Sequence, residues 1–403
     1  MSDATPAGRA VVPEPSLTKG YLFQLDLFRV LVFACVIGQH AVLWPVPQTS
    51  VVGWGMVMLL HATRQAFFFL SVLVATLSQL RSPRSVPRFW LRRLSEIGVP
   101  YLFWTAVYFA YTMIVTPASF DKAMAILGGD LRSGYYQLYF LVVLAQIYVV
   151  LPLFFWLVRV TRGHHGWVFS VSAGLELAMT AVHHYLRATT GFAGSLHNFS
   201  SVLLWPRRGV AYEFFVVAAV LAAEHFAEWH AFALRHTRQL LWAVAAVAVA
   251  NEVYYLVVEA IDHNPGYASD LYQPVAEVWF AAAIVGVYCL GCRYAARFAE
   301  SGPSRTSAFV TLAADASGGI YLSHVLVLQL VFSGLTPLAL PWGATAAILY
   351  VTTVVGATAL VMVFLRSPVR RIVTGPDRRA ERERLAVAHW PAEEKAEVMA
   401  GVR

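Results

Sequence analysis

Long apolar segments recur along the whole chain, and charged residues collect in the short stretches between them. Ten of these segments are about 20 residues long, the length that a helix needs to cross the roughly 30 Å hydrocarbon core of a bilayer. They cover residues 21–44, 54–80, 97–117, 135–158, 166–187, 209–227, 240–261, 273–292, 307–333 and 343–365. The pattern therefore predicts an all-α protein, a polytopic bundle of about ten transmembrane helices.

The basic residues indicate which ends of these spans face the cytoplasm, because cytoplasmic loops are enriched in Lys and Arg. With the amino terminus placed inside, 23 of the 30 basic residues fall in cytoplasmic segments, five fall outside and two lie within spans. Both termini are therefore expected in the cytoplasm. The polar start of the chain lacks the apolar core and cleavage site of a signal peptide, so we expect the first span to be retained.

This topology divides the chain into three parts. Residues 1–20 form a polar cytoplasmic tail, residues 21–366 form the ten-span membrane domain, and residues 367–403 form a charged cytoplasmic tail. The part after Gly375 mixes Arg, Glu and Ala, and we expect it to lie as a charged helix at the inner membrane surface.

Composition supports the membrane assignment and narrows the function. Apolar residues make up 58% of the chain and charged residues 13%, against about 45–50% and about 25% in soluble domains. The net charge of +7 is spread over short cytoplasmic loops, as topology alone requires, so no nucleic-acid partner is expected. Three cysteines are too few for a disulfide framework. The single pair Cys289 and Cys292 falls short of the four ligands of a structural zinc, and no metal is expected.

Ionisable residues inside spans are costly and therefore mark candidate sites. The first span carries Asp26, Arg29 and His40. Arg29 and His40 are eleven positions apart, which places them within about 20° of the same helix face and roughly 16 Å apart along the axis. One face then presents a cation towards the cytoplasm and an imidazole towards the outside. Alternatively, Arg29 pairs with Asp26 and His40 only lies at the membrane interface.

The second span carries His61 and Arg64. An unpaired cation near mid-membrane costs about 2.5–3.5 kcal/mol, so Arg64 is expected to face a polar cavity or a carboxylate. Later spans offer Glu213 and Glu277 towards the outer side and Glu252 near the middle. The alternative is that some of these acids lie at span ends in contact with water.

An arginine-rich segment joins the second and third spans, and it includes Arg88, Arg92 and Arg93, followed by Glu96. Arg88 and Arg92 are four positions apart and share a helix face. Guanidinium groups bind phosphate bidentately, so this cluster suits a phosphorylated ligand. The alternative is that the arginines only set the topology.

Several short motifs, taken in order, resemble the signature of the integral-membrane acyltransferase-3 family. They are Leu25 and Asp26 with Arg29 and His40; the run Phe67–Ser71; Arg92 and Arg93 followed by Pro100–Trp104; the run Tyr135–Leu141 with Gln146, Tyr148 and Leu151–Leu153; and the run Ser317–His324. The resemblance covers about residues 20–366. Two positions depart from the family pattern. Val72 stands where the family often has Gly, and Glu96 stands where it often has a second Arg, which leaves Arg88 and Arg92 as the better phosphate ligands.

The resemblance implies transfer of an acyl group, commonly acetyl, from cytoplasmic acyl-CoA to a hydroxyl of an envelope glycan or glycolipid. His40 and Arg29 would be the catalytic residues: His40 would act as the base or carry the acyl group, and Arg29 would orient the donor together with Arg88, Arg92 and Arg93, which would bind it. The cavity and acceptor site would include Asp26, His61, Arg64, Ser71, Tyr139, Glu213, Glu252, Glu277, Tyr321 and His324. Because His40 closely precedes Pro45, the sequence leaves open whether His40, His61 or His324 meets the thioester. The protein would reside in a bacterial inner or plasma membrane, and a homo-oligomer remains open.

Two other functions fit parts of the pattern. A transporter or flippase of a lipid-linked sugar would use the same buried charges without covalent chemistry. Many transporters contain inverted repeats and interrupted helices, and the sequence shows neither clearly. A structural membrane scaffold would not require Arg64, Glu252 and His40 within its spans.

Overall fold

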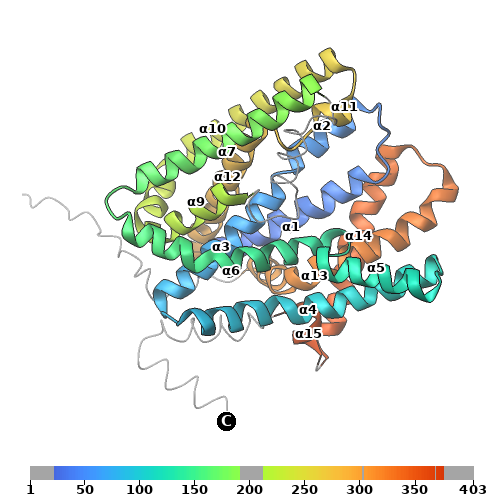
Figure 1. The fold of residues 1–403 in the computed structure, drawn as a ribbon. Coiled ribbons are helices and arrows are strands. Elements are labelled where there is room, and N and C mark those ends of the chain that lie inside the picture. The colour runs from blue at the N-terminus through green and yellow to red at the C-terminus, as the bar shows by residue number, and fades with distance from the viewer. Residues whose placement is uncertain (1–21, 191–211, 302–303, 368, 376–403) are drawn as a thin grey trace, which may run out of the picture. The chain divides into compact units, whose positions relative to one another are not determined.

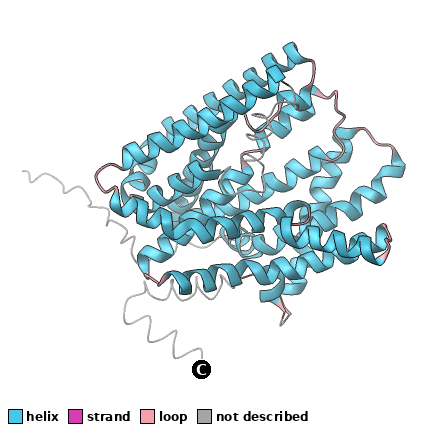
Figure 2. Cartoon of the chain, viewed as in Figure 1, coloured by secondary structure: helices cyan, strands magenta, loops and turns pink. Residues whose placement is uncertain are grey.

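The structure is a computed structural model that describes residues 22–190, 212–301, 304–367 and 369–375. Within these ranges every regular element is a helix (Figures 1 and 2). In chain order they are α1 (Gln24–Leu43), α2 (Val51–Leu60), α3 (Thr63–Arg81), α4 (Val86–Val115), α5 (Phe120–Ser133), η1 (Tyr136–Leu138), α6 (Tyr139–Val160), α7 (His165–Thr190), α9 (Glu213–Glu224), α10 (Phe226–Asp262), α11 (Pro265–Ala268), α12 (Pro274–Ser301), α13 (Arg305–Leu335), η4 (Thr336–Leu338), α14 (Trp342–Leu365) and α15 (Arg370–Thr374). The all-α prediction is confirmed for this part of the chain. The predicted tail 1–20, the start of the span 209–227 and the tail from residue 376 lie outside the described residues.

Eight helical segments in the described part of the chain are long and apolar enough to cross a membrane. They correspond to eight of the ten predicted spans. The other two, 166–187 and 209–227, contain α7 and α9, which do not meet the same length and hydropathy limits. Large apolar side chains such as Trp242 on α10 (68% exposed) and Val363 on α14 (68% exposed) face outward, as helices in contact with lipid require. The chain is thus a multi-pass membrane protein, and the count of ten spans stays a prediction.

The second span is interrupted, which corrects the expectation of a continuous helix over 54–80. Backbone turns at His61 and Ala62 separate α2 from α3, although the two together remain one candidate span, Val51–Arg81. The carbonyl of Leu59 accepts a 3.0 Å hydrogen bond from the indole Nε1 of Trp279 on α12. A side-chain donor thus satisfies a carbonyl near the interruption, as hydrocarbon surroundings require. The first turn of α3 consequently begins in the middle of the span.

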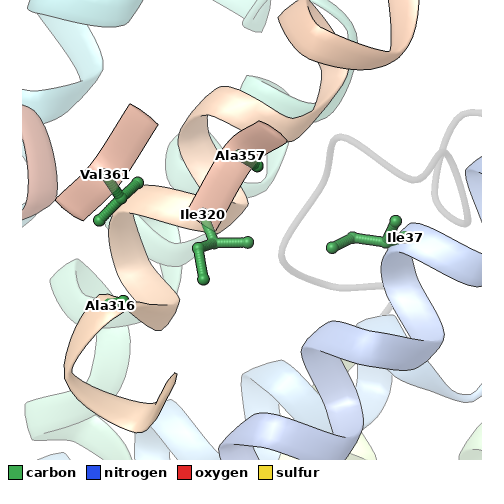
Figure 3. Close-up of a cluster of buried hydrophobic side chains, with 5 residues drawn as sticks. All are labelled: Ile37, Ala316, Ile320, Ala357 and Val361. Atoms are coloured by element: carbon green, nitrogen blue, oxygen red, sulfur yellow. The ribbon is translucent and has the colours of Figure 1, made fainter. Parts of the chain in front are cut away.

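Helix α1 contacts α2, α3, α12, α13 and α14 and is therefore the central element of the bundle. One cluster of buried apolar side chains joins α1 to α13 and α14 (Figure 3); it comprises Ile37, Ala316, Ile320, Ala357 and Val361. Gly319, in the Ser317–His324 motif, makes this contact close, because a Cβ there would lie 2.9 Å from Val361 Cγ2. The glycine therefore lets α13 approach α14.

A tight turn between α5 and α6 presents Tyr136 and Gln137 to the bundle interior. Gly134 begins it with φ +79°, and a Cβ at this position would overlap the backbone of Tyr139. Tyr136 follows with φ +28°, a region that bulky residues rarely adopt and that costs about 1–3 kcal/mol. Such strain persists where surrounding contacts hold it, and it is frequent at functional sites.

The described end of the chain packs onto the bundle. The Trp104 indole of α4 donates a 2.9 Å hydrogen bond to the carbonyl of Val373 in α15, and Val373 is fully buried. The described residues from Phe23 to Gly375 belong to one contact unit. The first residues of the predicted tail 367–403 therefore belong to the same packed structure as the spans.

The predicted orientation can be tested with cysteines placed in a variant without Cys35, Cys289 and Cys292. Cysteine at the exposed position Pro341, between α13 and α14, should react with an impermeant thiol reagent in intact cells, because this loop is expected outside. Cysteine at the exposed position His164, between α6 and α7, should react only after the membrane is opened. Labelling of position 164 in intact cells would contradict the orientation.

Candidate functional site

A cavity of about 200 Å³ lies where α1, the start of α3, the α5–α6 turn and α13 meet. Its lining combines apolar rings with hydrogen-bonding side chains. The lining residues are Val36, Gln39, His40, Thr63, Arg64, Phe67, Tyr136, Gln137, Tyr139, Phe140, Leu271 and Tyr321. This is the arrangement expected of a small-molecule site, mostly apolar with a few placed polar groups.

Two imidazoles lie side by side at this cavity. The rings of His40 on α1 and His324 on α13 are stacked, with centroids 5.4 Å apart and planes inclined by 27°. Nδ1 of His324 lies 2.5 Å from the carbonyl oxygen of Tyr321. A carbonyl only accepts, so Nδ1 carries the proton and Nε2 carries the lone pair. His324 is fully buried, and Nε2 has no hydrogen-bond partner among the described residues, which leaves it free to accept a proton.

His40 is partly exposed to the cavity and lies beside Tyr136. The Tyr136 hydroxyl is 3.5 Å from Nδ1 of His40, and it accepts a 3.0 Å hydrogen bond from the indole of Trp44. Because the indole can only donate, the phenol hydrogen remains available to His40. The strained turn at Tyr136 thus supplies a neighbour that orients the His40 ring.

A buried hydrogen-bond network fixes α13 beneath His324. The Tyr108 hydroxyl of α4 donates to the carbonyl of Leu322 at 2.8 Å and accepts from the backbone N–H of Leu326 at 3.1 Å. It therefore stands between a carbonyl and an N–H that a regular helix would pair directly. Gln137 Nε2 donates to the same hydroxyl at 2.6 Å, and the Tyr321 hydroxyl donates to the carbonyl of Gln137 at 2.7 Å. The α5–α6 turn and α13 are thus tied together around the site.

A cation and a hydroxyl line the opposite wall. Thr63 Oγ1 donates a 3.1 Å hydrogen bond to Gln39 Oε1, which joins the start of α3 to α1. Arg64 follows in the first turn of α3, with its guanidinium carbon 6.0 Å from the centre of the Tyr212 ring. Its Nε has no hydrogen-bond partner in the described part of the chain. The amino-terminal end of a helix carries partial positive charge, so this wall favours a negative group.

Carboxyl groups lie behind Arg64. Glu277 on α12 is buried and interacts electrostatically with Arg64 and with Glu176 on α7. Glu213 accepts a 3.0 Å hydrogen bond from Ser172 Oγ, also on α7. The expectation that Arg64 faces a polar cavity or a carboxylate agrees with both features.

The structure brings part of the predicted set together. His40, Arg64, Tyr139 and Tyr321 line the cavity. His324 stacks on His40, and His61 interacts electrostatically with both His40 and Arg64. Glu277 lies in the shell behind Arg64.

Other predicted residues lie elsewhere. Arg29 Nη1 forms a 3.1 Å ion pair with Asp26 Oδ1, and the two side chains are 11% and 1% exposed. Arg29 is therefore held away from the cavity, about 16 Å from His40 along α1. Ser71 lies two turns along α3 from Arg64, outside the lining residues, and Glu252 of α10 faces Gly55 of α2. The local Arg29–Asp26 pair was the alternative that the spacing left open.

Glu96 pairs with two of the predicted donor ligands. Arg92 Nε is 2.9 Å and Arg93 Nη1 is 3.0 Å from its two carboxylate oxygens. Arg92, expected to be one of the better phosphate ligands, therefore pairs with Glu96 as Arg93 does, because the i,i+4 spacing brings the two together as readily as i,i+3 does for Arg93. Arg88 is exposed.

Sequence reasoning missed several cavity residues. Gln39 and Thr63 adjoin selected residues along the chain, and Tyr136 and Gln137 lie within a motif that carried the family resemblance. Nothing in their pattern distinguishes them from ordinary span residues. They become part of the site through the α2–α3 interruption and the positive φ of Tyr136, which depend on contacts with α12 and α1.

Comparison with known proteins gives one match. The model of a family described as an acyltransferase domain matches residues 22–366. Comparisons with curated proteins and with solved structures gave no match.

The Tyr108 network predicts a specific loss of stability. Tyr108→Phe removes a buried hydroxyl that hydrogen-bonds to Leu322, Leu326 and Gln137, which should lower the free energy of unfolding by about 1–3 kcal/mol. Thermal unfolding of the purified protein measures this loss. Tyr111→Phe is the matched control on the same helix, because its hydroxyl makes no hydrogen bond to the described residues. Equal stability of the two variants would contradict the role of Tyr108.

Proposed function

The chain belongs to the acyltransferase-3 family, and on this basis we propose that it is a membrane O-acyltransferase. It would move an acyl group, acetyl in the simplest case, from cytoplasmic acyl-CoA to a hydroxyl of a cell-envelope glycan or glycolipid. The observation that carries this proposal is the stacked pair His40 and His324 at a cavity with a cationic wall. We also propose that both termini lie in the cytoplasm and that the protein resides in a bacterial cell membrane.

The proposed chemistry follows from the two imidazoles. A neutral imidazole removes the proton from the acceptor hydroxyl as the oxygen attacks the thioester carbonyl. The tetrahedral intermediate then collapses, the carbon–sulfur bond breaks, and the thiolate takes up the proton held by the imidazole. Nε2 of His324 has the available lone pair, and His40 lies at the cavity surface. We propose His40 as the group nearest the substrates and His324 as the partner that shares its proton.

Arg64 and the first turn of α3 are suited to stabilise the negative charge that develops on the thioester carbonyl oxygen during the reaction. The carbonyl oxygen becomes an oxyanion in the intermediate, and donors fixed at that point stabilise it most in surroundings without water. Arg64 lines the cavity with Nε unpaired within the described structure. This role accounts for an arginine in the middle of a span.

The donor would bind at the arginine-rich end of the bundle. A second cavity of about 170 Å³ lies between the ends of α3, α6 and α9, and its lining includes Gln79, Arg159 and Arg162. Thr76 of α3 lines this cavity, and Phe67 of the same helix lines the cavity at His40, which we call the reactive cavity. The two cavities are therefore about 13 Å apart along α3. We propose that the donor's phosphates bind at these arginines and at Arg88, Arg92 and Arg93, with the thioester arm extending along α3.

One observation favours a transporter as the second candidate. Transporters often place an interrupted helix and its partial charges at the membrane midplane, and the α2–α3 interruption beside Arg64 has this form. A transporter would move a lipid-linked sugar without breaking a thioester. Release of free CoA therefore separates the two functions.

The function is tested by measuring acyl-CoA binding and turnover separately in purified protein. His40→Ala should lower turnover by at least about a hundredfold, the usual contribution of a general base, while donor affinity stays within about twofold. His324→Asn should also lower turnover while donor affinity stays within about twofold, because it removes the unpartnered Nε2 lone pair of the ring stacked on His40. In cells, the wild-type gene should add O-acyl groups to envelope glycans or glycolipids.

Glu252→Gln provides a control with a polar change in a span but outside the cavity. Full turnover by His40→Ala would end its catalytic role. Absence of CoA release by the wild-type protein with envelope extracts would favour the transporter.

The proposed donor-binding arginines can be tested with two kinds of variant that should change acyl-CoA affinity in opposite directions. The double variant Arg88→Ala and Arg92→Ala should weaken acyl-CoA binding by tenfold or more, since a hydrogen bond to a charged group contributes about 1.5–3 kcal/mol. Glu96→Gln should strengthen binding, because it releases the guanidiniums of Arg92 and Arg93. Calorimetry measures both, with the exposed Arg238→Ala on α10 as control. Unchanged affinity in both variants would leave these arginines a role in topology alone.

A further inference from the structure

A separate, apolar cavity of about 230 Å³ lies between α1, the α2–α3 interruption, α10 and α12. Its walls are formed mainly by aliphatic side chains, among them Leu31, Leu59, Val244, Ala283 and Leu290. Apart from the Cys35 thiol, the polar side-chain groups in its lining are the Thr63 hydroxyl and the Trp279 indole N–H. The indole donates to Leu59, so the walls offer a ligand almost nothing but hydrocarbon contacts.

Thr63 lies between this apolar cavity and the cavity at His40. Its side chain lines both cavities, and its hydroxyl donates to Gln39, which lines the reactive cavity only. The Thr63–Gln39 hydrogen bond therefore stands at the boundary. A molecule in both cavities would have its polar part at His40 and its apolar part beyond Thr63.

The surrounding packing keeps the apolar cavity in place. Trp279 holds the interrupted helix through its 3.0 Å bond to Leu59. Gly286 of α12 brings α10 close, because a Cβ there would lie 3.0 Å from Val244 Cγ1. The cavity is thus bounded by fixed contacts on the α10 and α12 side.

The cavity extends away from His40 along α1 and reaches the outer surface of the bundle. Its lining includes Leu31, nine positions before His40, which is about 13 Å along the helix. Leu290 of α12 also lines the cavity and is 41% exposed on the surface where apolar side chains face outward. A hydrocarbon chain can therefore enter sideways from the bilayer.

We propose that this apolar cavity holds the hydrocarbon tail of a lipid-linked acceptor whose hydroxyl-bearing head occupies the reactive cavity. The inference rests on the proposed function and selects a glycolipid over a free glycan as the acceptor. An amphiphile placed this way has its head near the end of α1 at Leu43 and its tail towards the membrane interior. That is the orientation in which it already lies in the outer leaflet under the proposed topology.

The acyl chain of the donor fits this cavity less well. The arginine-lined cavity is formed with α6 and α9, whereas the apolar cavity is formed with α10 and α12. Donor and tail would therefore approach α3 from different sides. An acyl chain in the apolar cavity would also have to turn back from the reactive centre towards the end from which its own donor arm arrives.

Photo-crosslinking tests the tail site without requiring turnover. The probe is a dodecyl glycoside that carries a diazirine at the end of its chain, added to the full-length protein in lipid nanodiscs. The expected product is a crosslink to the α10 and α12 peptides that contain Val244 and Trp279. Excess unlabelled dodecyl glycoside should compete, and methyl glycoside should not. Crosslinking that dodecyl glycoside does not reduce would overturn the proposal.

Two variants fill the cavity from different walls, Ala283→Phe on α12 and Cys35→Phe on α1. Each should reduce crosslinking about tenfold or more, which corresponds to roughly two methylene groups excluded from burial. Ala243→Phe is the matched control, because Ala243 is exposed on α10 beside the cavity-lining Val244. An equal loss in the control would show a general packing defect and overturn the proposal.

Turnover assays distinguish whether the hydrocarbon chain in the apolar cavity belongs to the acceptor or to the acyl donor. With envelope glycolipid as acceptor, Ala283→Phe should lower the ratio of long-tailed to short-tailed acceptor use about tenfold and leave the preference between acetyl-CoA and octanoyl-CoA as it was. A change in donor preference alone would assign the cavity to the acyl chain and overturn the acceptor proposal. Crosslinking that persists in a protein without any CoA release would mean that the acyltransferase function fails while the chain-binding site stands.

Discussion

A backbone polar group inside the hydrocarbon core needs a partner within the protein, because no water is present to provide one. The Tyr108 hydroxyl shows how this constraint shapes the site, since it stands between the carbonyl of Leu322 and the N–H of Leu326. The same hydroxyl accepts from Gln137 Nε2, which ties the helix that carries His324 to α4 and to the α5–α6 turn. Trp279 likewise donates to the carbonyl of Leu59 near the α2–α3 interruption. Both walls of the cavity at His40 thus include backbone groups that bond to side chains of other helices.

The sequence was sufficient to predict the class of fold and most of the spans, because apolar length is a property of each segment alone. It also selected His40 as a costly group in an apolar segment, and the motif that carries the family resemblance selected His324; the two rings prove to be stacked. It could not predict the interruption at His61 or the turn at Tyr136, since these depend on Trp279 and Trp44 from distant parts of the chain. Gln39, Thr63 and Gln137 were missed for the same reason. Neutral polar residues in a span have no distinctive pattern until their partners are known.

The arginines show a different limit of prediction from sequence. Asp26 precedes Arg29 by three positions, and Glu96 follows Arg92 by four, so both pairs have the spacing of neighbours on one helix. The structure contains both ion pairs. Removing Arg29 would break the ion pair of a buried carboxylate, because Asp26 is only 1% exposed. A loss of function in such a variant would therefore report on folding as well as on chemistry. Arg64 differs, because it faces the cavity and its carboxylate neighbour Glu277 comes from another helix.

The interruption of the second span explains why three separate regions can meet at one point. A continuous helix would keep the N–H groups of Thr63 and Arg64 within its own hydrogen bonds and would present no helix end at mid-membrane. Ending α2 at Leu60 and starting α3 at Thr63 places a hydroxyl, a cation and a partial positive charge beside His40. The same residue, Thr63, borders the apolar cavity on the α10 and α12 side, while α3 continues towards the arginines. In the proposed function, the donor, the acceptor head and the apolar tail would then approach the imidazole pair from three directions without overlapping.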